Sequence, residues 1–97
     1  MTTTHEAALI LNALIIESDR GMRSKLKQTT HASSEYRSAH TSASLREGMS
    51  VLQTARIRFD VVFVSNHFGS NEVALFIQEA KASDRGADCA YIVIFRG

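Results

Sequence analysis

The sequence contains no proline, no tryptophan and only one cysteine, and its opposite charges nearly cancel. Cys89 has no second cysteine with which to form an internal disulfide, which favours a reducing compartment such as the cytoplasm. Eleven Lys and Arg against ten Asp and Glu give a net charge of +1, so no overall field attracts nucleic acid or anionic lipid. Binding must therefore depend on shape and on local groups.

Long apolar segments are also absent. The run from Ala7 to Ile16 is interrupted by Asn12 and has about half the length needed to cross a bilayer, so we expect no transmembrane helix and no membrane partner. The first six residues lack the basic start of a secretory signal. The 97 residues are 44% hydrophobic and 22% charged, which is typical of one soluble domain. We therefore expect a single cytoplasmic domain.

Metal and dinucleotide motifs are missing too. No Gly-x-Gly-x-x-Gly follows an apolar run, so a dinucleotide would lack its phosphate cradle. The four histidines lack metal-ligand spacing with one another and with the cysteine, so we expect no zinc site. They are His5, His31, His40 and His67.

Three strongly apolar runs are present, and each ends on a polar side chain. They are Ala13–Glu17, Val61–Ser65 and Ile92–Arg96. Ligands of open parallel sheets bind outside the carboxyl ends of the strands. We therefore expect the three terminal polar side chains to converge on one pocket.

Helical signals alternate with these runs, which favours a parallel sheet covered on both faces. Ser18 or Asp19 is expected to cap a helix that extends to about Ala32 and has a thin apolar face. The segment Tyr36–His40 is short and polar, so as a strand it should lie at a sheet edge. A Ser/Thr-rich loop, Thr41–Ser44, follows it.

Two further helices are predicted. Ser44 and Glu47 form a capping-box pattern that opens a helix with an apolar face. The next helix is expected to begin after a cap at Ser70 or Asn71 and to stop at a left-handed Gly86, before a strand that starts near residue 91. The expected apolar positions of the two helices are Leu45, Met49, Leu52, Val73, Phe76, Ile77 and Ala80.

The segments Leu14–Arg23 and Phe59–Ser65, in this order of elements, resemble the receiver domain of two-component response regulators. The resemblance covers residues 12–97 and leaves residues 1–11 as an N-terminal extension. It implies an α/β, doubly wound, flavodoxin-like three-layer sandwich with a parallel sheet of order 2-1-3-4-5. This chain supplies elements only through the fourth strand, so we expect the order 2-1-3-4 with the fifth strand missing.

The family transfers a phosphoryl group to an aspartate after the third strand, with a divalent cation held by an acidic pair after the first. The resemblance places Glu17 and Ser18 at the acidic pair, Ser65 at the phosphoacceptor and Arg96 at a hydroxyl position after the fourth strand. Three of these four residues depart from the family pattern. The family's lysine after the fifth strand has no counterpart.

These departures imply a degenerate pocket. A serine hydroxyl needs a base to activate it and would form a stable ester, unlike a carboxylate. Only Glu17 and Asp19 remain as carboxylates for Mg²⁺, so we expect weak or absent metal binding and no cofactor. Arg96 would place a cation where the metal's charge normally lies, and could pair with Glu17 or simply be solvated.

Three functions remain open. The first is a pseudo-receiver, a non-enzymatic signalling module that recognises a protein partner without aspartate phosphorylation. The second is a regulator switched by modification of Ser65, and the third is a binder of an anionic metabolite anchored by Arg96. For Ser65, a hydroxyl bonded to the local backbone is the simpler interpretation. A hydrolase triad with His67 and Asp19 lacks a nucleophile elbow.

Two surface features complete the expectations. The basic cluster between Arg20 and Lys27 lacks interleaved aromatic residues. We therefore interpret it as the solvent-exposed face of a helix rather than a nucleic-acid site. The apolar strand Tyr91–Phe95 has no proline to protect it, and an unprotected edge invites pairing. We expect this chain to self-associate through that strand or to lack a C-terminal segment that covers it.

Overall fold

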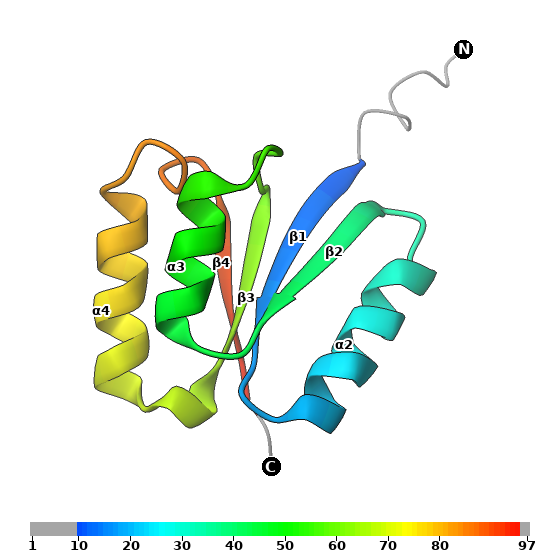
Figure 1. Ribbon diagram of the computed structural model, residues 1–97, viewed down its shortest axis with the longest axis horizontal. Helices are drawn as coiled ribbons and strands as arrows, with labels where there is room; N and C mark the ends of the chain where they lie inside the picture. Colours follow the sequence, from blue (N-terminus) through cyan, green and yellow to red (C-terminus); the bar gives the residue numbers. More distant parts are fainter. Residues whose placement is uncertain (1–9, 96–97) are drawn as a thin grey trace.

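The computed structural model describes residues 10–95, which alternate between strands and helices (Figure 1). The elements in chain order are β1 (Leu11–Ile16), α2 (Arg20–Ala32), β2 (Tyr36–Ser42), α3 (Leu45–Thr54), β3 (Val61–Ser65), the 3-10 turn η1 (Asn66–Phe68), α4 (Ser70–Lys81) and β4 (Ala90–Ile94).

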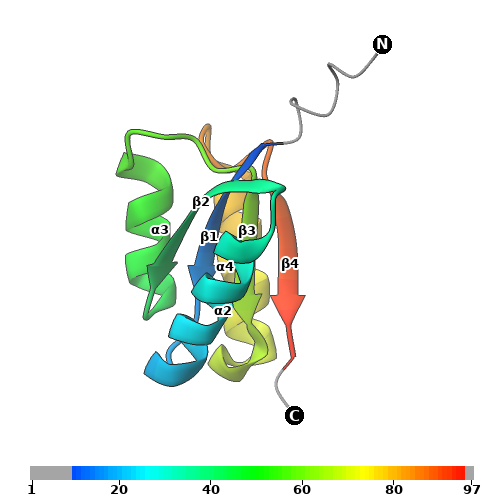
Figure 2. The same ribbon diagram turned by 90° about the vertical axis from the view of Figure 1, so that its right-hand side faces the viewer.

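The four described strands form one parallel sheet of order β2-β1-β3-β4. Helix α2 covers one face of this sheet, and α3 and α4 cover the other (Figures 1 and 2). The prediction of a flavodoxin-like three-layer sandwich with strand order 2-1-3-4 is thereby confirmed. All four strands run in the same direction, so their carboxyl ends share the lower edge in Figure 1.

The main core lies between the sheet and the α3–α4 layer. Leu14 and Ile16 from β1, Val62 and Val64 from β3, and Leu52 from α3 are all at most 1% exposed. Full burial of each large aliphatic side chain contributes about 1.5–3 kcal/mol. Helix α2 contributes no fully buried residue, in agreement with its predicted thin apolar face.

The polar strand β2 lies at an edge, as predicted, but it extends two residues further, to Ser42. The capping pattern of α3 is also present. The Ser44 hydroxyl accepts a hydrogen bond from the Glu47 N–H at 3.0 Å, and Glu47 Oε1 accepts one from the Ala43 N–H at 2.7 Å. Glu47 thus reaches one residue further back than in the usual capping box.

Two predictions for α4 are wrong. Neither Ser70 nor Asn71 caps the helix, because Gly69 occupies the N-cap with φ 99° and makes no side-chain hydrogen bond. The chain turns directly out of η1 here, and glycine adopts a positive φ without steric cost. Gly86 is not a left-handed stop, since α4 already ends at Lys81 and, within residues 10–95, only Gly69 is a positive-φ glycine.

Candidate functional site

Two of the three residues predicted to form a pocket lie at the carboxyl edge of the sheet. Glu17 follows β1 directly and Ser65 ends the neighbouring strand β3, whose Val64 pairs with Ile16. Both predicted residues are 0% exposed. The third, Arg96, lies outside the described residues.

Both the backbone and the carboxylate of Glu17 make hydrogen bonds. Its N–H donates to the Ser42 carbonyl at 3.0 Å, which ties it to the end of β2. Carboxylate Oε2 accepts a hydrogen bond from the Asp19 N–H at 2.8 Å, and the Glu17 carbonyl accepts one from Arg23 Nη1 at 2.9 Å. The buried carboxylate therefore helps to order the turn into α2.

The two residues after Glu17 have different environments. Ser18 is exposed, and its carbonyl accepts a second hydrogen bond from Arg23 Nη1 at 3.2 Å. Asp19 is the N-cap of α2, and its Oδ2 accepts a hydrogen bond from the Met22 N–H at 2.8 Å. The Asp19 carboxylate thus satisfies one of the unpaired donors at the start of the helix.

The Ser65 hydroxyl is hydrogen-bonded to the backbone two residues further along the chain. Its hydroxyl accepts a hydrogen bond from the His67 N–H at 3.2 Å and caps η1. This confirms the interpretation of Ser65 as a locally bonded strand-end hydroxyl. The contact uses the backbone of His67 rather than its imidazole, and the Asp19 carboxylate is occupied by Met22, so the geometry does not favour a catalytic triad.

Sequence reasoning missed Ser42, the third buried polar residue at this edge. Its side chain is 2% exposed, and its hydroxyl has no hydrogen-bond partner among residues 10–95. The sequence prediction ended β2 at His40 and assigned Ser42 to a loop. A strand two residues longer would have placed it beside Ile16, its partner in the sheet.

The two carboxylates expected for Mg²⁺ both accept hydrogen bonds from backbone N–H groups. Mg²⁺ prefers octahedral oxygen coordination with one or two carboxylates. Here Asp19 caps a helix and Glu17 Oε2 accepts a backbone N–H. No group of three or more His, Cys, Asp or Glu suited to a metal ion occurs between residues 10 and 95.

Cys89 packs as a small hydrophobic residue. It is 8% exposed, and its thiol donates to the Phe59 carbonyl at 3.0 Å. Burial raises the pKa of the Cys89 thiol, so the nucleophilic thiolate is disfavoured at neutral pH. Cys89 is thus part of the hydrophobic core.

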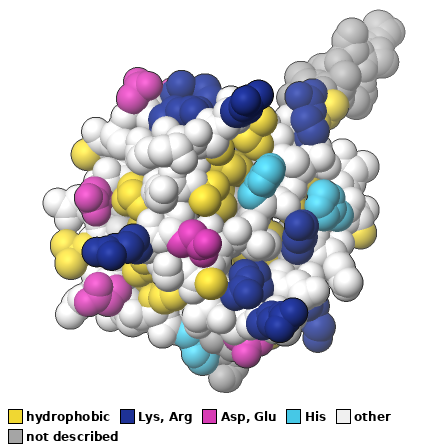
Figure 3. Space-filling model, in the orientation of Figure 1, with side chains coloured by type: hydrophobic (Ala, Val, Ile, Leu, Met, Phe, Trp, Pro, Cys, Tyr) yellow, Lys and Arg dark blue, Asp and Glu magenta, His cyan; other side chains and the backbone are white. Residues whose placement is uncertain are grey.

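The basic cluster lies on α2. Arg20, Lys25 and Lys27 are exposed, as expected for the wet side of a helix, and basic side chains gather over α2 in Figure 3. Arg23 is the exception, because it is partly buried and bonds the carbonyls after β1. It therefore has a structural role at the pocket.

The sheet face under α2 is apolar toward β4. Ile15, Phe63 and Ile92 are register partners that form one row across β1, β3 and β4. Exposure rises along this row from 1% at Ile15 to 45% at Ile92, because α2 does not extend over β4 (Figure 2). A hollow of about 460 Å³ lies between α2 and this part of the sheet.

The other face of β4 is also incompletely covered. A second hollow, of about 370 Å³, is lined by Ile77 of α4 together with Val93 and Phe95. Phe95 is 77% exposed. Within residues 10–95, β4 therefore lies at the edge of the sheet, and its apolar side chains are incompletely covered on both faces.

Comparison of the chain with protein-family models, with curated proteins and with solved structures found no match. Across the described part of the chain, no helix has both the length and the apolar character needed to span a membrane.

Proposed function

We propose that this chain is a pseudo-receiver, a non-enzymatic module that acts in cytoplasmic signalling through protein contacts and without phosphoryl transfer. The observation that carries the proposal is the burial and hydrogen bonding of Ser65. A fully buried hydroxyl, bonded to the local backbone, stands where a receiver would present an accessible aspartate.

The neighbouring acids support the same conclusion. Phosphoryl transfer depends on positioning and on cations that neutralise the developing charge. Glu17 and Asp19 instead bond backbone N–H groups around the start of α2. These two carboxylates thus stabilise the fold, which favours recognition by other surfaces.

The strand β4 is the surface that we propose for self-association. An unprotected edge presents a row of backbone donors and acceptors to another strand. The Ile92 side chain adds exposed apolar area beside these groups. In the 97-residue chain we propose that a second copy supplies the pairing strand.

The two alternatives have less support. A kinase would have to reach Ser65, which is 0% exposed. An anion site anchored by Arg96 remains a prediction, because that residue lies outside the described range. A thermal-shift screen of small anions tests it, since a ligand that binds only the folded state raises the unfolding temperature.

The proposal predicts that acetyl phosphate with Mg²⁺ does not label the protein. The expected result in intact-mass spectrometry is the mass of the unmodified chain, because no carboxylate stands at the phosphoacceptor position to form an acyl phosphate. Phosphate on this domain that hydroxylamine removes would overturn the proposed function.

The double variant Ser18→Asp with Ser65→Asp is the control. It restores two acids to the pocket but not the family's lysine. We expect a Mg²⁺-dependent rise in its unfolding temperature with little or no phosphorylation, whereas the parent chain shows neither effect. A similar Mg²⁺ response in the parent chain would argue against the loss of the metal site.

A further inference from the structure

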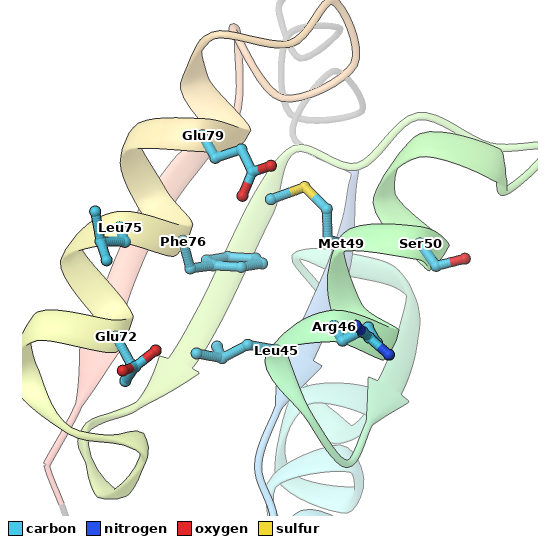
Figure 4. A pocket seen from close by; sticks show the side chains of 8 residues that line it. All are labelled: Leu45, Arg46, Met49, Ser50, Glu72, Leu75, Phe76 and Glu79. Atoms are coloured by element: carbon cyan, nitrogen blue, oxygen red, sulfur yellow. The ribbon is translucent and has the colours of Figure 1, made fainter.

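Helices α3 and α4 lie side by side on one face of the sheet and enclose a groove of about 630 Å³ (Figure 4). Its floor is apolar. Leu45 and Met49 come from α3, and Phe76, which is 5% exposed, comes from α4. The residues that line this groove include none from β4 and none of Glu17, Ser42 and Ser65.

The α4 side of the groove carries a regular stripe of exposed residues. Glu72, Leu75 and Glu79 follow one another at intervals of three and four, so they share one side of the helix. Leu75 is 60% exposed, although α4 already supplies Val73 and Phe76 to the core. The stripe therefore adds apolar surface between two acids rather than completing the core.

The charged side chains that line the groove are Glu72 and Glu79 from α4 and Arg46 from α3. Neither Glu72 nor Glu79 pairs with a cation from residues 10–95, where the ion pair is Arg58 with Asp84. Arg46 lies on the α3 side, across the groove from Glu72 (Figure 4). In Figure 3, apolar side chains show between α3 and α4, and the acidic side chains over α4 have a basic side chain between them. The α4 rim thus presents two carboxylates that make no ion pair within residues 10–95, beside an apolar floor and opposite one cation, Arg46.

We propose that the α3–α4 groove binds an amphipathic basic helix of a partner protein. The inference rests on the proposed function as a protein-interaction module and names the surface and the partner's chemistry. Apolar side chains of the partner helix contact Phe76 and Leu75. Two Lys or Arg side chains, seven residues or about 10.5 Å apart along that helix, face Glu72 and Glu79.

Charge and backbone chemistry favour this occupant over others. The acidic rim repels the phosphates of nucleic acid. The groove walls are helices, whose backbone groups are already paired, so an added strand finds no hydrogen-bond partners there. A helix satisfies its own backbone and needs only side-chain contacts, which the groove supplies.

The test uses a fluorescein-labelled 15-residue model helix that carries leucines on one face and two lysines seven residues apart. Anisotropy is measured against the full chain in the Ile92→Lys background, which removes the β4 contact. We expect saturable binding that weakens roughly tenfold in the double variant Glu72→Lys with Glu79→Lys, because two exposed ion pairs are lost. The matched control Glu35→Lys changes an exposed acid outside the groove and leaves the affinity unchanged.

A charge-swapped peptide makes the test specific. When glutamates replace the two lysines, the peptide is expected to bind the double variant better than the parent chain, which also shows that the variant is folded. Leu75→Ser weakens binding of the lysine peptide severalfold, whereas Ser at another exposed apolar position, Ile10, leaves it unchanged.

Absence of binding, or equal affinity in the groove variants, overturns the inference. A change in the mass of the parent chain caused by the groove variants would identify a second copy as the occupant and would also overturn it. No phosphodonor is present in this experiment. Its failure is therefore distinguishable from failure of the proposed function, which phosphate labelling tests.

Discussion

The proposed self-association through β4 predicts that replacement of Ile92 by lysine yields a monomer. Ile92 is 45% exposed on the edge strand β4, in the part of the sheet that α2 leaves open. Lysine on an edge strand opposes pairing, and like charges brought together across a two-fold interface cost several kcal/mol. We therefore expect the association to weaken roughly 100-fold or more. Light scattering after size exclusion measures the change at micromolar concentration.

The control is Leu75→Lys, which makes the same kind of replacement on α4. Leu75 is 60% exposed and lies away from β4, so its variant should keep the mass of the parent chain. A parent chain that is monomeric and cooperatively folded at high micromolar concentration would refute the account of the edge. An Ile92→Lys chain that remains associated would refute the role of β4.

Gly86→Ala is expected to lower the free energy of unfolding strongly. A Cβ atom at this position would lie 2.2 Å from the Ala80 carbonyl oxygen and 2.6 Å from the Tyr91 hydroxyl oxygen. The Tyr91 hydroxyl donates to the Gly86 carbonyl at 2.7 Å, and burial raises the pKa of Tyr91 to about 12, so it remains a donor at neutral pH. Relief of the clash requires movement of backbone, which costs about 1–3 kcal/mol or more.

Chemical denaturation in the monomeric Ile92→Lys background measures this loss, and Gly21→Ala is the matched control. A Cβ atom at Gly21 lies 3.5 Å from Asp19 Oδ2, an ordinary contact, and the residue is helical and exposed. This control should leave the free energy of unfolding unchanged or raise it by up to about 1 kcal/mol. Equal stability of the Gly86 and Gly21 variants would show that the loop before β4 accommodates a Cβ atom, and would contradict the predicted clash.

The fold was predictable because the strongest local signals agree with the tertiary structure. The apolar residues of β1 and β3 are buried between helices, as the central strands of a parallel sheet require. Ser44 and Glu47 mark the start of α3 through short-range hydrogen bonds that depend on spacing alone. Such features need no knowledge of distant residues.

The errors concern positions decided by distant contacts or by the backbone path. Gly86 was interpreted as a helix stop, but its small size is required by Ala80 and Tyr91, and a local pattern does not reveal such a clash. Gly69 replaces the expected cap because the path out of η1 demands a positive φ. Local propensity at Ser70 and Asn71 carries no information about that path.

The candidate site was predictable in part. The carboxyl-edge rule places Glu17 and Ser65 at the ends of neighbouring strands, where both are buried. The rule does not say which backbone N–H groups these side chains bond, and those bonds decide their chemistry. Ser42 was missed because its polar strand has no apolar pattern that would mark its end.

The most direct test of the central claim is light scattering of the parent chain with and without acetyl phosphate and Mg²⁺. A module that acts through protein contacts and without phosphoryl transfer should show the same mass, larger than the monomer, under both conditions. A shift between monomer and oligomer that depends on the phosphodonor would contradict the account, because it would show that the pocket still controls association.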